Sequence, residues 1–464
     1  MADRLSRLDR SFLAYESPVG HMHIAGTATF EGGALRRPDG GLDISRIRAY
    51  VESRLSRIPR YRQVVASSPL GVPIWVDDPH FDIEYHVRHT SLPPPGDERQ
   101  LKALCGRVCS QALDRAKPLW ELWMVDRVVE EERFAFICKV HHAMVDGVGS
   151  VDLLGELLTQ EPVADPEPGP RWVARPALPA VRLALDDLSR LARAPLGFAR
   201  RLPGLLSEAR QPGSDLRAAV RGLTDLAFKT LRRPSETPLN RPIGTHRRFD
   251  WLATSLDDVQ AVRRAFGGTV NDVVLATVTG GVRRFLAHRG VSPDGLQFRV
   301  LAPVNVRAAD GHGELGNQVA AWMIELPIAE PDPRRRLETL QQTTLRLKEE
   351  KNALGMHWFT EMTGWAPAPL LSLGARLSQR NLPFNMVVTN VPGPKQPLYL
   401  LGARMRDYYG LVPLTDYLGL GIVVFSYAGK LNWGFNADWD LVPDVDVFAS
   451  CIDGAFGELR GLVG

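Results

Sequence analysis

The segment 134–147 constrains the fold more than any other part of the chain. Residues 134–140, Phe-Ala-Phe-Ile-Cys-Lys-Val, are almost continuously apolar, which is typical of a strand buried on both faces near the centre of a sheet. The run His-His-Ala-Met-Val-Asp-Gly follows at once, and a helical stretch is expected over 150–158. Because α/β proteins place reactive groups where a strand ends before a helix, the sequence predicts an α/β fold with its chemistry at this loop.

Further strands and helices are distributed over both ends of the chain. The pattern predicts strands at 22–30, 122–129, 298–304, 386–389 and 420–427, and helices at 44–57, 270–288 and 334–351.

Two proline clusters, at 161–170 and 234–242, divide this array. We therefore expect an N-terminal domain over 1–161 and a C-terminal domain over 243–464. Residues 162–242 between them are expected to form a proline-rich linker and a connector of short amphipathic helices, because prolines interrupt this leucine- and alanine-rich region.

Composition excludes several classes of protein. The 464 residues are 44% hydrophobic and 23% charged, which is ordinary globular composition. A net charge of +3, from 56 basic and 53 acidic residues, is too balanced for a protein whose main partner is a nucleic acid. The N-terminus is charged throughout, and the longest apolar stretch, 417–428, is shorter than the roughly 20 residues of a spanning helix. We expect a cytoplasmic protein that contacts membranes only from their surface.

No metal site is expected. The four cysteines form no C-x-x-C pair, so neither a disulfide framework nor a zinc ribbon is indicated. His21 and His23 share one face of a predicted strand, but no further ligands stand at a suitable spacing.

Strand parity separates the two adjacent histidines. If the strand continues through them, His142 shares a face with Cys138 and Val140, whereas His141 shares the opposite face with Lys139. Only one imidazole then faces a given pocket. The competing interpretation is a polar loop with two structural histidines.

H-H-x-x-x-D-G resembles the signature of the CoA-dependent acyltransferase superfamily, which includes chloramphenicol acetyltransferase and peptide-synthetase condensation domains. Other segments are similar to those of one branch, the bacterial wax ester synthase/acyl-CoA:diacylglycerol acyltransferases, and they occur in the same order over nearly the whole chain. These segments are Leu5–Phe12, Met22–Ile24, Pro118-Leu119-Trp120, Asn271-Asp272, Pro303–Arg307 and Asn390–Pro394.

The resemblance implies two chloramphenicol-acetyltransferase-like domains, each a mixed sheet flanked by helices, joined by the helical connector. It also implies an O-acyltransferase with its site in a channel between the halves. That enzyme would esterify diacylglycerol, a long-chain alcohol or both with acyl-CoA as co-substrate, and would need no bound cofactor. Another acyl transfer of the superfamily, such as condensation or polyketide esterification, and a non-catalytic lipid-droplet surface protein are the alternatives.

The resemblance assigns the general base to His142, with His141 in support. Asp146 either orients His142 or holds the loop, and Gly147 gives the backbone room beside the acyl chain or pantetheine arm. No G-x-S-x-G elbow surrounds Ser150, which disfavours a serine nucleophile. Direct transfer between two bound substrates is therefore expected.

The remaining motifs receive supporting roles. Asn271 either donates a hydrogen bond to the oxyanion or acceptor, or caps a helix, for which asparagine is also suited. Asp272 is interpreted as architectural. Pro118, Leu119 and Trp120 are interpreted as packing beneath the site.

The connector carries an excess of positive charge. Residues 171–233 contain about thirteen Arg or Lys against about five Asp or Glu, set among leucines and alanines. This pattern fits a surface that docks on anionic lipid at the inner membrane face or on lipid droplets. It equally fits a helical bridge whose arginines are solvated.

Overall fold

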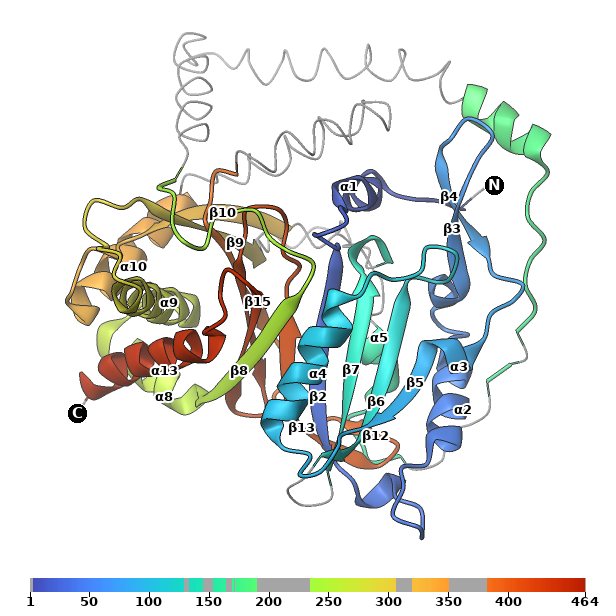
Figure 1. The fold of residues 1–464 in the computed structure, drawn as a ribbon, viewed down its shortest axis with the longest axis horizontal. Coiled ribbons are helices and arrows are strands. Elements are labelled where there is room, and N and C mark those ends of the chain that lie inside the picture. Colours follow the sequence, from blue (N-terminus) through green and yellow to red (C-terminus); the bar gives the residue numbers. More distant parts are fainter. Residues whose placement is uncertain are drawn as a thin grey trace.

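The computed structural model describes residues 3–128, 133–144, 153–163, 169–170, 172–189, 234–305, 319–349 and 382–463. Within these residues the chain forms two six-stranded sheets with helices against them, and one small three-stranded sheet (Figure 1). The architecture is the mixed α/β fold predicted from the sequence.

The N-terminal sheet has β7 near its centre. Its order is β12 (Tyr399–Leu400), β13 (Ala403–Leu411), β2 (His23–Glu31), β7 (Arg133–His141), β6 (Trp120–Val128) and β5 (Val87–Ser91). β7 pairs antiparallel with β2 on one side and β6 on the other. Every residue of β7 from Phe134 to His141 is buried, as the continuous apolar pattern predicted.

Helices cover both faces of this sheet. The elements are α1 (Arg7–Tyr15), α2 (Ile44–Arg54), α3 (Ile83–His86), α4 (Glu98–Ser110) and α5 (Leu153–Leu157). Phe134 and Phe136 share one hydrophobic cluster with Ile47 of α2, whereas Ala135 and Ile137 share another with residues of α4. The alternation follows from the pleat, because successive side chains of a strand point to opposite faces.

The three-stranded sheet lies beside the N-terminal sheet. It consists of β1 (Asp3–Arg4), β4 (Pro73–Asp77) and β3 (Gln63–Ser67), in that order. Short 3₁₀ turns complete this half at Gly33–Leu35, Pro59–Arg62 and His142–Met144, the last named η3.

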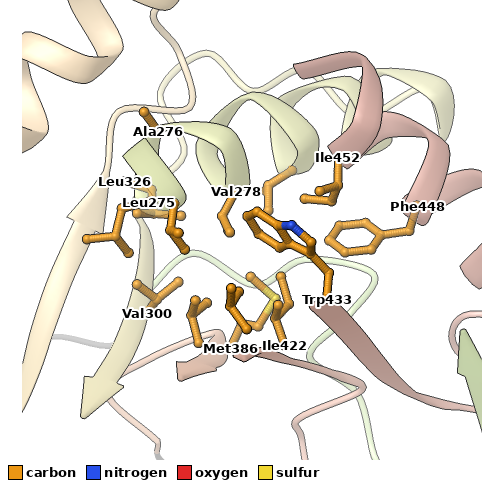
Figure 2. Packing of buried hydrophobic residues seen from close by; sticks show 14 of the residues in the cluster. Leu275, Ala276, Val278, Val300, Leu326, Met386, Ile422, Trp433, Phe448 and Ile452 are labelled. Carbon is orange, nitrogen blue, oxygen red and sulfur yellow. The ribbon is translucent and has the colours of Figure 1, made fainter. Parts of the chain in front are cut away.

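The C-terminal sheet is mixed. Its order is β10 (Val319–Leu326), β9 (Phe298–Asn305), β11 (Met386–Pro392), β14 (Leu420–Tyr427), β15 (Lys430–Asp438) and β8 (Arg247–Ser255). Its helices are α8 (Leu256–Phe266), α9 (Val270–His288), α10 (Pro333–Glu349) and α13 (Val445–Gly461). Figure 2 shows the core that α9 and α13 form over the sheet, with Trp433 between Val278, Phe448 and Ile452.

Two strands, β12 and β13, cross between the halves. β13 follows the proline-rich loop after β11, yet it pairs antiparallel with β2 of the N-terminal sheet, with Leu411 opposite Ala25. The division of the chain at 161 and 242 did not predict that strands from the C-terminal part would join the N-terminal sheet. Proline clusters mark linkers, but the sheet edge that a later strand joins depends on long-range pairing, which composition does not report.

The predicted secondary structure is confirmed with shifted ends. The helix expected at 270–288 is α9, and the strand expected at 420–427 is β14. The helix expected at 44–57 ends at Arg54, and the helical stretch at 150–158 is α5 within its described part. Of the connector, 171 and 190–233 lie outside the described residues. No helix in the described ranges is long and apolar enough to cross a membrane.

Candidate active site

His142 stands at the point where β7 ends. The strand runs to His141, and His142 begins η3, so strand parity no longer sets the direction of its side chain. The His142 N–H donates to the carbonyl of Met22 at 2.7 Å. Its ring stacks on Phe12 of α1, with centroids 3.9 Å apart and an interplanar angle of 26°. Two residues near the N-terminus, both far from His142 in the sequence, therefore hold it in place.

The electrostatic surroundings of His142 favour the neutral imidazole. Burial lowers its pKa from 6.5 to about 4, and the neighbouring His141 acts in the same direction. Nδ1 of His142 is buried and has no hydrogen-bond partner in the described part of the chain. At neutral pH the ring keeps a lone pair, as proton abstraction requires.

His141 points into a different environment and is 1% exposed. Its backbone N–H donates to Leu119 at 2.9 Å, and its Nδ1 accepts the N–H of Ala143 at 3.0 Å. Because a backbone N–H can only donate, Nδ1 carries no proton, and the ring is the neutral Nε2–H tautomer. Nε2 lies 3.7 Å from Oε2 of Glu16.

Glu16 is the centre of a partly buried charged cluster. It is the C-cap residue of α1, and Arg115 binds its Oε2 with two guanidinium nitrogens. His23 Nε2 and His21 Nδ1 lie 3.6 and 3.9 Å from its Oε1. Burial opposes ionisation of this carboxyl, but His141 and Arg115 outweigh it and lower the pKa to about 2. Among the described residues, no group of His, Cys, Asp and Glu is arranged to hold a metal ion.

The Pro118-Leu119-Trp120 motif supports the backbone of the histidine loop. Leu119 supplies the carbonyl that His141 binds, and Trp120 is fully buried. The indole N–H of Trp120 donates to the Tyr61 carbonyl at 2.8 Å, and the Tyr61 hydroxyl accepts the N–H of Leu153 at 3.4 Å. Leu153 begins α5, so the motif and Tyr61 fix the chain before and after the loop.

Asn271 and Asp272 make different contacts at the start of α9. Thr269 is the N-cap, and Asp272 completes a capping box with it, so the helix-cap interpretation of Asn271 is wrong. Asp272 also accepts a hydrogen bond from Thr344 of α10 at 2.7 Å, which ties the two helices together. The Asn271 side-chain oxygen instead accepts a hydrogen bond from Nδ2 of Asn390 at 3.4 Å.

The Asn390–Pro394 segment continues a strand. Residues to Pro392 belong to β11 and pair with β14, and Gly393 follows with its N–H bound to Oγ of Ser426 at 3.0 Å. A Cβ at Gly393 would collide with the Ser426 carbonyl and the Phe425 ring, so only glycine fits there. Two motifs predicted separately from the sequence thus meet at the Asn271–Asn390 contact.

Two predicted site residues, Asp146 and Gly147, lie outside the described residues, as does the end of the Pro303–Arg307 motif.

Two models of one protein family match most of this chain. The model of the wax ester synthase/diacylglycerol acyltransferase catalytic domain matches residues 5–274, and that of the C-terminal domain of the same family matches 315–460. A protein of Mycobacterium tuberculosis (strain ATCC 25618 / H37Rv), named a probable diacylglycerol O-acyltransferase, tgs1, is 31% identical over 98% of this chain and 96% of its own. The chain belongs to the wax ester synthase/diacylglycerol acyltransferase family.

Solved structures agree with this assignment. The wax ester synthase/diacylglycerol acyltransferase from Marinobacter aquaeolei VT8 superposes with a TM-score of 0.68 at 25% identity, over 99% of this chain and 100% of the other. The first condensation domain of the CDA synthetase shares the fold, with a TM-score of 0.55 at 14% identity, over 100% of this chain and 97% of that domain. The two-domain fold and the O-acyltransferase class inferred from the motifs are confirmed.

In this family member, sequence reasoning missed Glu16 and Tyr61. Glu16, the C-cap of α1, follows Phe12 by four positions, which is about one helical turn, and this spacing was the available signal. Tyr61 carries no such signal, because its contacts with Trp120 and Leu153 join segments 59 and 92 residues apart.

The acidic limb of the pH–rate profile is expected near pH 4. His142 must be neutral to accept a proton, and its pKa is about 4, so kcat/KM should stay level down to about pH 5 and then fall. An acidic limb centred near 6.5 would contradict a buried base.

Stability must be measured alongside this profile. Burial also lowers the pKa of His86 to about 4, and an unfolded chain protonates both rings at about 6.5. Their contribution to stability is therefore complete above about pH 6.5 and falls as the pH drops towards 4. Thermal unfolding at each pH separates loss of fold from loss of the base.

Proposed function

We propose that the protein transfers the acyl group of acyl-CoA to diacylglycerol, a long-chain alcohol or both, with His142 as the general base in a ternary complex. The observation that carries this proposal is a neutral, buried His142 whose backbone and ring are both held in place. The class of reaction comes from the family, and the relative from Mycobacterium tuberculosis bears the diacylglycerol O-acyltransferase name.

The proposed step balances without a bound cofactor. The acceptor hydroxyl gives its proton to His142 while its oxygen bonds to the thioester carbonyl carbon. The C–S bond then breaks, and the CoA thiolate takes the proton back from His142. In this scheme the Asn271 amide, held by Asn390, donates to the oxyanion or positions the acceptor.

A thiol-release assay tests the proposal. Purified protein is given palmitoyl-CoA with hexadecanol, with a diacylglycerol, or with no acceptor, and the free thiol and the ester are both measured. We expect thiol release that depends on an acceptor and matches ester formation. Acceptor-independent release, or no ester with either acceptor, would contradict it. Transfer from an acyl carrier protein alone would favour the condensation-like alternative.

No covalent acyl-protein should accumulate when palmitoyl-CoA is supplied without an acceptor. Direct transfer has no acyl-enzyme, and burial raises the pKa of Cys105 and of Cys109, the latter to about 11, which keeps both thiols protonated and unreactive. Intact-mass spectrometry checks this expectation. A stable adduct on the parent protein that is absent from a His142→Ala variant would overturn the ternary-complex mechanism.

We further propose that the connector docks on an anionic lipid surface. Within its described part, a helix spans 180–189, and Val181, Leu185 and Leu188 are 72%, 62% and 54% exposed. Their spacing of four and three residues places them on one side of this helix. On the other side, Leu183 and Asp187 are buried.

The buried side of this helix anchors it to the protein. Arg4 of β1 pairs with both Asp186 and Asp187, and Ser68 donates to Asp187 at 2.5 Å. The apolar side is therefore held outward by ion pairs beneath it. An outward apolar stripe in an arginine-rich segment is the pattern of an interfacial helix.

Replacing Val181, Leu185 and Leu188 together with asparagine should weaken binding to anionic vesicles about 30-fold or more. Burial of three such side chains contributes roughly 2–4 kcal/mol after allowing for their partial exposure. Co-sedimentation with phosphatidylglycerol vesicles measures the effect, and binding should also decrease as salt rises. A Leu345→Asn, Leu462→Asn double variant is the control, since both residues are exposed on the C-terminal half. If the triple variant and the parent bind the vesicles equally, the connector serves only as a bridge between the two domains.

A further inference from the structure

Helix α1 contacts both adjacent histidines through one face. Phe12 stacks on the His142 ring, and Glu16, one turn later, lies 3.7 Å from His141 Nε2. Glu16, the C-cap residue, stands four positions after Phe12, so the two side chains lie on the same side of the helix end. Movement of α1 would therefore disturb His141 and His142 together.

His141 connects Glu16 to the backbone that presents His142. Its Nδ1 accepts the N–H of Ala143, the residue directly after His142, within η3. That contact requires the proton on Nε2, which is the nitrogen nearest Glu16. A carboxylate at this place favours the Nε2–H tautomer, because the other tautomer would turn a lone pair towards a negative charge. The separation of 3.7 Å is electrostatic contact that a shift of about 0.5–1 Å would turn into a hydrogen bond.

Glu16 has neighbours at both of its carboxylate oxygens. Arg115 binds its Oε2 and also donates to the Leu13 carbonyl at 3.3 Å, so the guanidinium joins the carboxylate to the last turn of α1. His21 and His23 approach Oε1, the other oxygen. Neither nitrogen of the buried His23 ring has a hydrogen-bond partner among the described residues. Arg115 thus supplies the hydrogen-bonded cation of this partly buried carboxylate, and His141 is its other stabilising neighbour.

We propose that Glu16 is a positioning residue for acyl transfer: its carboxylate fixes the tautomer and orientation of His141, and His141 in turn fixes the turn that aims His142. This inference rests on the proposed role of His142 as base. Glu16 touches neither substrate nor reacting atoms in this scheme. Its effect therefore passes entirely through His141.

A double-mutant cycle on kcat tests whether Glu16 acts through His141. We expect Glu16→Gln to lower kcat roughly 10–100-fold, the scale of a misplacement of about 1 Å, with KM for palmitoyl-CoA within about twofold of the parent. Glu16→Asp should recover part of the loss. His141→Asn keeps an acceptor near the Ala143 N–H but removes the contact with Glu16. In that background Glu16→Gln should cause no further loss.

Asp126→Asn is the matched control. Asp126 is also a buried carboxylate of the N-terminal sheet, pairs with Arg36, and stands towards the end of β6 away from Trp120. This variant should lower the melting temperature without changing kcat of the folded protein. If Glu16→Gln does not fold, Arg115→Met replaces it in the cycle, since Arg115 is 54% exposed and its loss releases the carboxylate.

Each outcome decides the matter. Multiplicative losses in the double variant, or a Glu16→Gln protein that behaves like Asp126→Asn, would overturn the positioning role. If the parent forms no ester, or His142→Ala keeps its activity, the proposed function fails instead. An active parent with an inactive His142→Ala variant leaves only the role of Glu16 in question.

Discussion

His142→Ala is expected to lower kcat by roughly 10²–10⁴-fold while the fold stays intact. Its ring accepts the acceptor proton in the proposed mechanism, and it is the imidazole that stacks on Phe12 of α1. His142 lies just beyond the end of β7, so truncation of its side chain removes the Phe12 stack but no sheet hydrogen bond. Steady-state kinetics with palmitoyl-CoA and the better acceptor measure the loss.

His141→Ala is the comparison variant. It removes the acceptor for the Ala143 N–H and the partner of Glu16, but leaves the base present. We expect a smaller loss of kcat than for His142→Ala and a lower melting temperature, because His141 is 1% exposed and its removal leaves the buried Ala143 N–H without an acceptor. Equal and complete loss at both positions, with normal melting of both proteins, would contradict the division of roles.

The sequence predicted the central strand because β7 is buried on both faces, which leaves a simple local pattern. It also predicted α9, whose Thr269 cap and Asp272 partner are neighbours in the chain. Such features depend on residues within one or two turns of each other. The family motifs made it possible to predict the fold as a whole, since they occur in order along nearly the entire chain.

What the sequence did not predict depends on contacts between distant segments. β13 joins the N-terminal sheet by pairing with β2, about 380 residues earlier in the chain. No local sequence pattern shows that β13 pairs with this sheet and not with the C-terminal sheet, whose strands are nearer in the sequence. Strand parity assigned faces correctly up to Val140, but the chain turns into η3 at His142. The stack on Phe12, not the pleat, determines where this ring lies.

Trp120→Ala is expected to destabilise the N-terminal half by about 3–5 kcal/mol, the usual cost of truncating a buried tryptophan. Trp120 is fully buried, and His86 stacks on its ring with centroids 4.5 Å apart while Nδ1 of His86 binds the Trp120 carbonyl at 2.8 Å. Truncation also leaves the Tyr61 carbonyl without the indole donor. Urea unfolding followed by tryptophan fluorescence and by circular dichroism measures the change.

Trp433→Ala separates stability from positioning. Trp433 is equally buried, and its indole N–H donates to Thr254 at 3.1 Å, but it belongs to the core of the C-terminal half. Both variants should lose similar stability. Under conditions where both remain folded, only Trp120→Ala should also lose kcat, by about 10–100-fold, because only Trp120 adjoins Leu119 and binds Tyr61, which hold the histidine loop at its two ends. If the two folded variants show the same kcat, Trp120 stabilises the sheet without positioning His142.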